Sequence, residues 1–366
     1  MDKRATFGFV LIALVLMVWM WFNTPPPQTG KPRPDSAATS IAVQPESAKA
    51  KPPLERPVEA EHKEKEQGLG QFFSSRAKGA EKILVVETDL YRAEITTKGG
   101  LIRKWELKNF KTWNQFPVQL VDPEKGGDFS LLFISKDGKQ INTRNLYFNA
   151  AFSSGVTTTL AGEESLSVNL ELPVGEGKKI VKRLTFTNNK YSFDAEVLFV
   201  GMQDVVSGFE YQVVWENTLP YAEHNSIDES GFARAYAYSG GELAEIDATS
   251  ETEQVKKDIT GVTDWVAMRN KYFALAIMPT SAQSQGGYLE GSRKAQPDRG
   301  EKESYNLALK MPFKAQREER SRFTVFLGPL DFSLIKSMDK GLDHIMSLGA
   351  AWIIRPITEY LMLPLF

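Results

Sequence analysis

The sequence predicts an all-β protein built on one large antiparallel β-sandwich, with a transmembrane helix before it and amphipathic helices after it. From residue 81 to residue 328, short runs rich in Val, Ile, Thr, Phe and Tyr are separated by Gly, Asn and Asp turn residues. No helical period lies between these runs, which favours antiparallel strands in a sandwich over a parallel α/β sheet. An uncharged apolar run over residues 5–22 predicts the transmembrane helix.

The N-terminal apolar run is long enough to cross a bilayer. Its eighteen residues rise by about 27 Å in a helix, against a hydrocarbon core of about 30 Å. Lys3 and Arg4 precede it, so we expect the N-terminus in the cytoplasm and the rest of the chain across the membrane. A cleaved signal peptide is the alternative, but its apolar centre is usually shorter and a small-residue cleavage site should follow. We therefore predict an uncleaved anchor over residues 1–23.

Residues 24–80 are predicted to be a disordered linker. They carry nine of the 19 prolines and a run of charged residues at 59–66. Such a composition buries too little apolar surface to offset the entropy of the chain. As a flexible coil, a segment of this length spans about 40 Å, enough to hold a domain away from the anchor.

Residues 81–328 are predicted to form one domain, because no linker-like stretch interrupts them. The chain has no cysteine, so the core must hold this domain together without disulfides. Leu184 and Phe186 alternate with polar residues, the period of a strand with one solvated face. We expect thirteen strands, near residues 83–87, 91–96, 101–107, 130–135, 166–172, 180–187, 192–200, 210–216, 233–238, 264–267, 272–277, 305–311 and 321–327.

Residues 329–366 change to a helical period. Apolar residues recur every three to four positions between Ile335 and Met346, which predicts one amphipathic helix ending near Gly349. A second helix is expected from Ala350, and its charged face suits the membrane interface better than a span. The residues predicted to lie at the membrane interface are Trp352, Ile353, Ile354, Arg355, Ile357, Glu359 and Leu361. The chain stops at Phe366 without a polar tail, and we interpret this as an artificial end.

The composition argues against several kinds of function. A net charge of −2 provides no basic field for nucleic acid. Without cysteine there is no thiolate zinc site, iron–sulfur cluster or thiol chemistry. The three histidines, His62, His224 and His344, are too scattered to indicate a metal centre. We therefore predict no metal and no cofactor.

The sequence also offers little for catalysis. Within residues 223–229, a histidine among carboxylates could serve acid–base chemistry, but the polar surroundings favour a solvated loop. Trp105, Trp113, Trp215 and Trp265 could line a sugar or peptide cleft, although packing in the core is the more common role of tryptophan. We predict no catalytic residue and expect the chain not to be an enzyme.

Several segments carry a resemblance to a known family when they are taken in order. Residues 91–102 contain two strands around a Gly-Gly turn, and residues 182–191 form a central hairpin. Residues 264–279 give an aromatic-rich pair of strands, which is the most specific of the matches. Together with residues 326–329 and 352–357, they resemble the first span, periplasmic domain and interfacial helix of the bacterial YidC membrane-protein insertases.

This resemblance implies a galactose-mutarotase-like β-supersandwich in the periplasm, attached to the bacterial inner membrane. It implies a role in the insertion and folding of inner-membrane proteins, with and without the Sec translocon. The expected partners are membrane lipid, Sec translocon components and nascent membrane proteins, and no nucleic acid. The family's core of five further spans, with its groove arginine, is not in this sequence, and Arg355 is not that arginine.

Two other functions are consistent with the same residues. One is a membrane-tethered sugar-binding or mutarotase-like β-sandwich domain, which glycan binding or mutarotation would favour. The other is a purely structural envelope protein.

Overall fold

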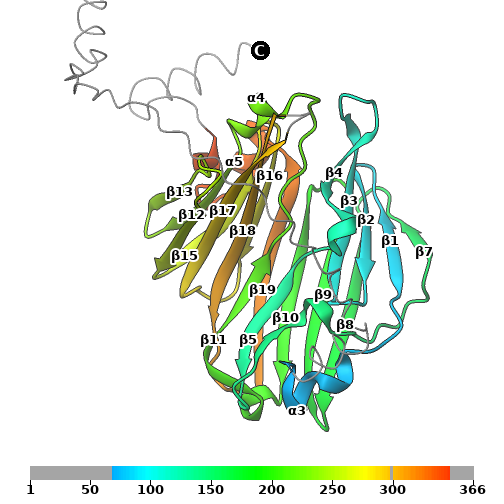
Figure 1. Ribbon diagram of the computed structural model, residues 1–366. Coiled ribbons are helices and arrows are strands. Elements are labelled where there is room, and N and C mark those ends of the chain that lie inside the picture. Colours follow the sequence, from blue (N-terminus) through cyan, green and yellow to red (C-terminus); the bar gives the residue numbers. More distant parts are fainter. Residues whose placement is uncertain (1–67, 297–299, 347–366) are drawn as a thin grey trace, which may run out of the picture. The chain divides into compact units, whose positions relative to one another are not determined.

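Residues 68–296 and 300–346 are described by the computed structural model, and they form three β-sheets with a few short helices (Figure 1). They fall within Arg56–Phe366, whereas residues 1–55 lie outside the described residues. The predicted anchor, the linker up to residue 67 and the second C-terminal helix also lie outside them. Among the described residues, no helix is both long and apolar enough to cross a bilayer.

The three sheets contain nineteen strands. The eight-stranded sheet has the order β13 (Glu242–Ile246), β12 (Arg234–Ser239), β15 (Thr263–Arg269), β16 (Phe273–Pro279), β19 (Glu318–Pro329), β10 (Ser192–Val200), β9 (Lys178–Thr187) and β8 (Ser165–Gly175). The six-stranded sheet has the order β14 (Val255–Thr260), β17 (Gly286–Gln296), β18 (Gly300–Pro312), β11 (Val206–Trp215), β5 (Ser130–Ser135) and β6 (Gln140–Asn142). The five-stranded sheet has the order β4 (Pro117–Val121), β3 (Leu101–Lys111), β2 (Tyr91–Thr96), β1 (Ile83–Glu87) and β7 (Val156–Thr159). Fifteen of the strand pairs are antiparallel, as the sequence predicts, whereas β1 and β7 form a parallel pair that was not predicted.

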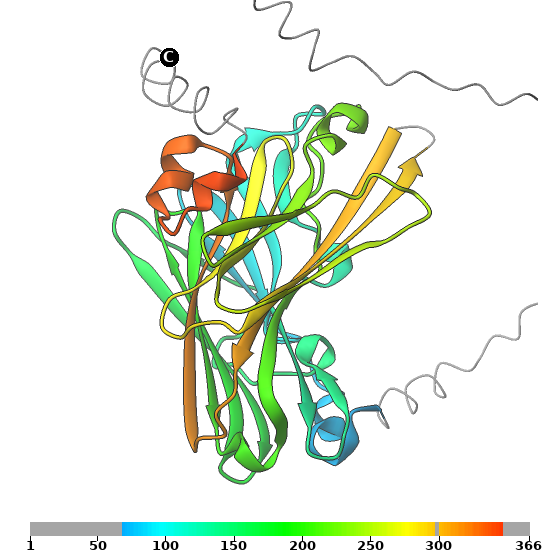
Figure 2. The same cartoon turned by 90° about the vertical axis from the view of Figure 1, so that its left-hand side faces the viewer.

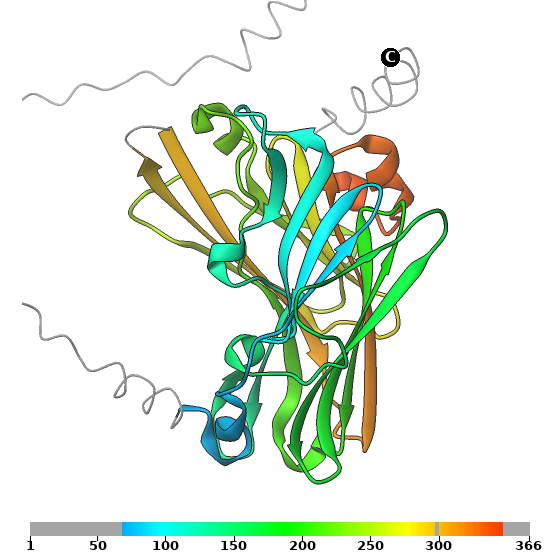
Figure 3. The same ribbon diagram turned by 90° about the vertical axis from the view of Figure 1, so that its right-hand side faces the viewer.

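Short helices connect or cover the strands. They are α3 (Gly70–Phe73), η1 (Ser74–Arg76), η2 (Pro123–Lys125), η3 (Thr143–Asn145), η4 (Met202–Asp204), α4 (Ser226–Ser230), α5 (Phe332–Ser337) and η5 (Leu342–Ile345). Figures 2 and 3 show α4, α5 and the turn between β3 and β4 at one end of the sandwich, with α3 at the other.

The five- and six-stranded sheets pack on the same face of the eight-stranded sheet. On β10, alternate residues from Phe193 to Phe199 are buried, so they share one face of the strand. The ring of Phe193 lies 5.9 Å from that of Trp105 on β3 and 5.9 Å from that of Phe129, next to β5. One side chain of the large sheet therefore contacts both smaller sheets, and a single main core lies between the two layers.

The opposite face of the eight-stranded sheet is covered by the C-terminal helices. Ala274 and Ala276 of β16 point to this face and pack with Ile335 of α5 and Leu342 of η5, while the alternate residues of β16 enter the main core. Every residue of β16 is buried, because both faces of this strand are covered. The small alanines allow the helices to approach the sheet closely.

Each of the thirteen expected strands overlaps an observed strand, and six further strands were not predicted. These are β4, β6, β7, β13, β14 and β17. Five of them are edge strands, which pair on one side only and keep much polar surface. The sixth, β17, contains three glycines and a polar C-terminal half, so its apolar alternation is weak.

The predicted linker extends too far toward the sandwich. Residues 70–76 are helical, in α3 and η1, although the sequence predicts disorder up to residue 80. Phe73 is fully buried, and its ring packs edge-on against Phe133 of β5 at 5.6 Å. The side chain of Phe73 attaches this segment to the core. The prediction missed it because the residues further upstream are rich in charge and proline.

The first C-terminal helix is not continuous. The period predicts one continuous helix that ends near Gly349, but α5 ends at Ser337, and Asp339, Lys340 and Gly341 all have positive φ before η5 begins. The indole Nε1 of Trp265 donates a hydrogen bond of 2.8 Å to the carbonyl of Lys340, which fixes the turn against β15. The apolar residues still face the sheet, so the periodicity identifies the buried face but not the break.

Candidate functional site

A cleft of about 940 Å³ lies at the end of the sandwich that carries α4 and α5, and we call it the terminal cleft. Five separate parts of the chain form it: the turn between β3 and β4, the turn between β9 and β10, the residues before α4, the turn between β15 and β16, and the start of α5. Its apolar lining includes Phe110, Trp113, Tyr191, Tyr272, Phe273, Leu330 and Leu334, and its polar lining includes Lys111, Glu223, His224, Lys271 and Asp331.

Aromatic rings form the wall of the terminal cleft. Phe110, on β3, packs edge-on against Phe273 of β16 at 5.6 Å and against Tyr191 at 6.4 Å. Trp113 packs edge-on against the ring of His224 at 4.5 Å, and half of its surface remains exposed. The wall therefore offers an apolar surface that is held by contacts between strands and loops.

Three of the four tryptophans considered in the sequence are core residues, and one is not. Trp105, Trp215 and Trp265 are fully buried, as expected. Trp113 lines the terminal cleft instead, because it lies in the turn after β3 rather than in a strand. The residue type is the same at all four positions, so it does not indicate which tryptophan is in the core and which lines the cleft.

Paired charges form the rim of the terminal cleft. The Lys271 ammonium donates to Asp228 Oδ2 at 2.5 Å and to Glu223 Oε1 at 2.9 Å, and the Tyr272 hydroxyl also donates to Glu223. The hydrogen bonds from Tyr272 and Lys271 hold the pKa of Glu223 below its usual value. The bonds to Asp228 and Glu223 raise the pKa of Lys271. Both groups therefore stay charged near neutral pH, and neither is suited to proton transfer there.

The stretch 223–229 was predicted to be a solvated loop, and this is wrong for its C-terminal part. Asn225 caps α4 by accepting from the Ile227 amide at 3.0 Å, and Glu229 in α4 is fully buried. Glu229 Oε2 accepts hydrogen bonds from the amides of Ala222 at 2.8 Å and Glu223 at 3.0 Å. Burial raises the pKa of Glu229 to about 7. Its carboxylate thus holds the backbone of the cleft rim.

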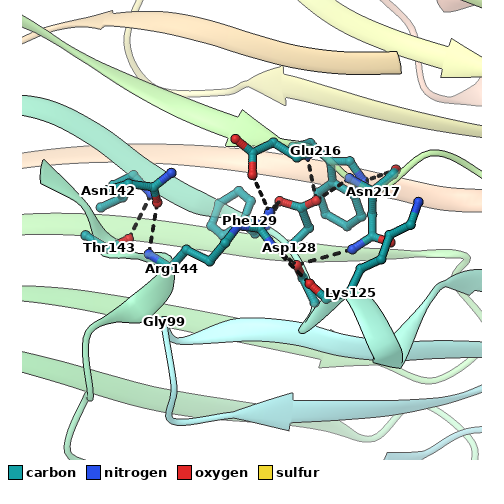
Figure 4. A network of polar contacts seen from close by, with 12 residues as sticks. Gly99, Lys125, Asp128, Phe129, Asn142, Thr143, Arg144, Glu216 and Asn217 are labelled. Atoms are coloured by element: carbon teal, nitrogen blue, oxygen red, sulfur yellow. Dashed lines mark hydrogen bonds and ion pairs between the residues drawn. The ribbon is translucent and has the colours of Figure 1, made fainter. Parts of the chain in front are cut away.

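A second group of charges is buried between the sheets, and we call it the interior network (Figure 4). Asp128 is fully buried, and its Oδ1 accepts from Arg144 Nη2 at 2.8 Å. Its Oδ2 accepts from the amides of Glu216 at 2.6 Å and Asn217 at 2.5 Å, at the end of β11. Burial raises the pKa of Asp128 to about 6, against the opposing effect of Arg144.

Lys182 of β9 completes the interior network. Its ammonium is fully buried and donates to the carbonyls of Gly99 at 2.9 Å, Gly100 at 3.2 Å and Phe129 at 2.6 Å. Gly99 and Gly100 have positive φ in the turn between β2 and β3, which brings both carbonyls toward the core. Three carbonyls occupy the three donors of the ammonium, and burial lowers the pKa of Lys182 to about 7.

The interior network therefore joins the sheets. Lys182 belongs to the eight-stranded sheet, the glycine carbonyls to the five-stranded sheet, and Phe129 precedes β5 of the six-stranded sheet. No donor of the protonated ammonium is left for a ligand, so the geometry is that of a structural contact. From the sequence, Lys182 is predicted only as part of a strand.

The residues predicted for the membrane interface cannot be placed in this geometry. Trp352, Ile353, Ile354, Arg355, Ile357, Glu359 and Leu361 all lie outside the described residues. Within residues 68–296 and 300–346, no three His, Asp or Glu side chains are grouped to hold a metal ion.

The described part is thus a two-layered β-sandwich domain with an aromatic cleft at one end. A family model of the YidC periplasmic domain matches residues 83–360. The chain therefore belongs to the YidC periplasmic domain family, as the resemblance in the sequence predicts. This family implies an inner-membrane protein with a periplasmic domain.

Curated relatives agree with this assignment. The chain is 36% identical over 367 residues to the membrane protein insertase YidC of Chlorobaculum tepidum and 35% identical over 368 residues to that of Chlorobaculum parvum. Each match covers all of this chain and 60% of the relative, so the chain spans about 60% of their length. Both relatives are named membrane protein insertases.

Solved structures with a similar fold are more distant. A GalM/aldose epimerase homologue from C. elegans is 9% identical, with a TM-score of 0.42, and the match covers 69% of this chain and all of that one. An α-N-acetylgalactosaminidase from Bifidobacterium bifidum is 10% identical, with a TM-score of 0.44, and the match covers 72% of this chain and 39% of that one. At this distance, neither similarity indicates an activity for this chain.

Proposed function

We propose that the chain is the N-terminal and periplasmic portion of a membrane-protein insertase. In this role it aids the insertion and folding of inner-membrane proteins, with and without the Sec translocon. The family match carries the proposal, because it starts at the first strand of the sandwich and extends to residue 360. It thus includes both the sandwich and most of the segment predicted to lie at the membrane interface.

Insertion requires no covalent step, which agrees with a cleft rim whose Glu223 and Lys271 stay charged near neutral pH. A charged residue at the centre of a bilayer costs about 2.5–3.5 kcal/mol on insertion scales. On this proposal, the groove that lowers this cost belongs to the part of the relatives that this chain does not cover. The chain contributes an anchor over residues 1–23, a tether, a docking domain and a helix that positions the membrane core.

The terminal cleft is the surface that we assign to docking. Its aromatic wall can receive an apolar segment, and its paired charges can orient polar groups at the rim. The proposed partners are nascent membrane proteins, components of the Sec translocon and membrane lipid.

The orientation in the membrane tests this proposal. The chain has no cysteine, so Glu176→Cys, in the exposed turn between β8 and β9, and Asp2→Cys each introduce a unique thiol. In spheroplasts, a maleimide that cannot cross membranes should label Glu176→Cys at once and Asp2→Cys only after lysis. Labelling of Asp2→Cys alone in intact spheroplasts would contradict a cytoplasmic N-terminus and a periplasmic sandwich.

The C-terminal segment is proposed to lie in the membrane interface through Trp352, Ile353, Ile354, Ile357 and Leu361, with its charged residues at headgroup level. A chain lacking residues 1–24 should still float with liposomes. An Ile354→Asp substitution should reduce the floated fraction about tenfold, because a buried isoleucine contributes about 1.5–3 kcal/mol.

The matched control is Ile134→Asp, which puts the same charge on an exposed isoleucine of β5. It should leave flotation unchanged. Equal flotation of both variants would contradict the interfacial assignment.

A further inference from the structure

Large apolar side chains are exposed together at the end of the sandwich that holds the terminal cleft. They stand on three elements: the turn between β3 and β4, α4 with the residues that follow it, and the turn between β15 and β16. Figures 1 and 2 show these elements at the same end. Their exposed fractions are 66% for Phe116, 57% for Ile227, 52% for Trp113, 41% for Phe232 and 39% for Tyr272. We call these five residues the apolar tips.

The apolar tips are held in place by the backbone. The amide of Thr112 donates to the carbonyl of Phe116 at 2.9 Å, which closes the turn after β3. The amide of Trp113 donates to the carbonyl of Ala222 at 2.9 Å, which joins this turn to the residues before α4. The exposure of Trp113 and Phe116 is therefore a feature of an ordered turn.

The chain leaves the described sandwich beside the apolar tips. The guanidinium of Arg269 donates to the carbonyl of Ile345 at 2.8 Å and to the carbonyl of Phe232 at 3.3 Å. The same guanidinium lies 5.9 Å from the centre of the Phe232 ring. The amide of Leu330, just before α5, donates to the carbonyl of Tyr272 at 2.7 Å. Two of the tips are thus joined to the residues that lead into the C-terminal segment.

We propose that the apolar tips contact the headgroup layer of the membrane and seat this end of the sandwich on the bilayer. The inference rests on the proposed function, which puts the segment after Met346 at the membrane interface. Since Ile345 is bound to the same arginine as Phe232, a bilayer at that segment lies within reach of the tips.

The chemistry of the tips favours lipid over a protein partner. Tryptophan and tyrosine are enriched at the headgroup level, where a ring can be partly apolar and partly wet. The tips lie on separate turns, with the paired charges of Lys271, Glu223 and Asp228 close by. Lipid headgroups are mobile, so they can contact side chains that stand apart on separate turns. A protein partner requires a continuous complementary surface.

The test uses the full chain in vesicles of phosphatidylethanolamine and phosphatidylglycerol. Asn114→Cys puts a unique thiol between Trp113 and Phe116 for an environment-sensitive fluorophore, and Glu176→Cys puts one near α3, at the other end. Nitroxide lipids should quench the label at residue 114 and shift its emission to the blue, while the label at residue 176 stays in water. A label at residue 114 that is neither shifted nor quenched would overturn the inference.

Two double variants show whether the apolar tips themselves contact lipid or are only held near the bilayer by the rest of the chain. Trp113→Ser with Phe116→Ser should lower lipid quenching at residue 114 by about twofold or more, since the apolar contact is lost. Ile134→Ser with Phe209→Ser removes two side chains that are at least as exposed, at 54% and 79%, on β5 and β11, and should leave the quenching unchanged. Circular dichroism of each variant verifies that the sandwich is folded.

The remaining outcomes would overturn the inference. A blue shift without quenching by lipid nitroxides would identify a protein contact at this end. Quenching that persists in the Trp113→Ser and Phe116→Ser double variant would mean that the tips contribute nothing to the contact. Maleimide labelling of Glu176→Cys in spheroplasts tests the proposed function separately. If that residue is labelled from outside but the fluorophore at residue 114 is not quenched by lipid, only the present inference is contradicted.

Discussion

The interior network and the terminal cleft are built from the same kinds of side chain and behave in opposite ways. In the interior network, Lys182 donates to three carbonyls, and burial lowers its pKa to about 7. At the terminal cleft, Lys271 donates to two carboxylates, and its pKa is raised. Here the group with a pKa near neutrality is the structural one, and the accessible group stays charged. A shifted pKa therefore reports burial or pairing before it reports catalysis.

The largest expected effect is on Lys182. Lys182→Met keeps most of the volume but leaves the carbonyls of Gly99, Gly100 and Phe129 without a donor. We expect a loss of about 3 kcal/mol in the free energy of unfolding, because buried polar groups without partners are costly. Chemical denaturation, followed by the fluorescence of the buried tryptophans, measures this loss. The control is Lys271→Met, and an equal loss in both variants would refute the contrast between the two clusters.

The next effect is on the pH dependence of stability. The folded state holds the proton of Glu229 more tightly than the unfolded state, because its pKa is about 7 instead of 4.5. This contribution to stability is full below pH 4.5 and is lost as the pH rises to about 7. Glu229→Gln keeps acceptors for both amides and should make that slope shallower by up to about 1.4 kcal/mol per pH unit.

Glu223→Gln is the matched variant, and it should change the pH dependence of stability in the opposite direction. The pKa of Glu223 is lowered in the folded state, so its contribution is present at neutral pH and is lost as the pH falls. Thermal unfolding between pH 4 and pH 8 would record both slopes. A change of the same sign in the two variants would contradict the assigned burial of Glu229 and pairing of Glu223.

The smallest effect is on Lys271. Its ion pairs with Glu223 and Asp228 are accessible to water, so Lys271→Met should cost much less stability than Lys182→Met. In about 1 M salt, where the screening length is about 3 Å, the effect of Lys271→Met should disappear. The effect of Lys182→Met should persist, because salt does not enter the interior network. Loss of both effects in salt would show that water reaches Lys182.

Much of the fold follows from the sequence, and the gaps have physical reasons. The central strands β9 and β10 show their period clearly, because one face is buried and the other is not. The edge strands β4 and β7 were not predicted, because a strand that pairs on one side keeps a mixed pattern. The sequence does not distinguish Trp113 from Trp105. Trp105 is in the core because it lies within β3, whereas Trp113 lines the cleft because it lies in the turn after β3.

The sequence by itself determined the antiparallel sandwich and the family, because alternation and motif order are local properties of the chain. Only the tertiary structure decided where charges are buried and where a cleft opens. The terminal cleft brings together residues near 110, 223, 271 and 331, and Lys182 meets carbonyls from two other sheets. A local pattern reports that a strand has an apolar face, but which elements cover that face depends on how distant segments pack.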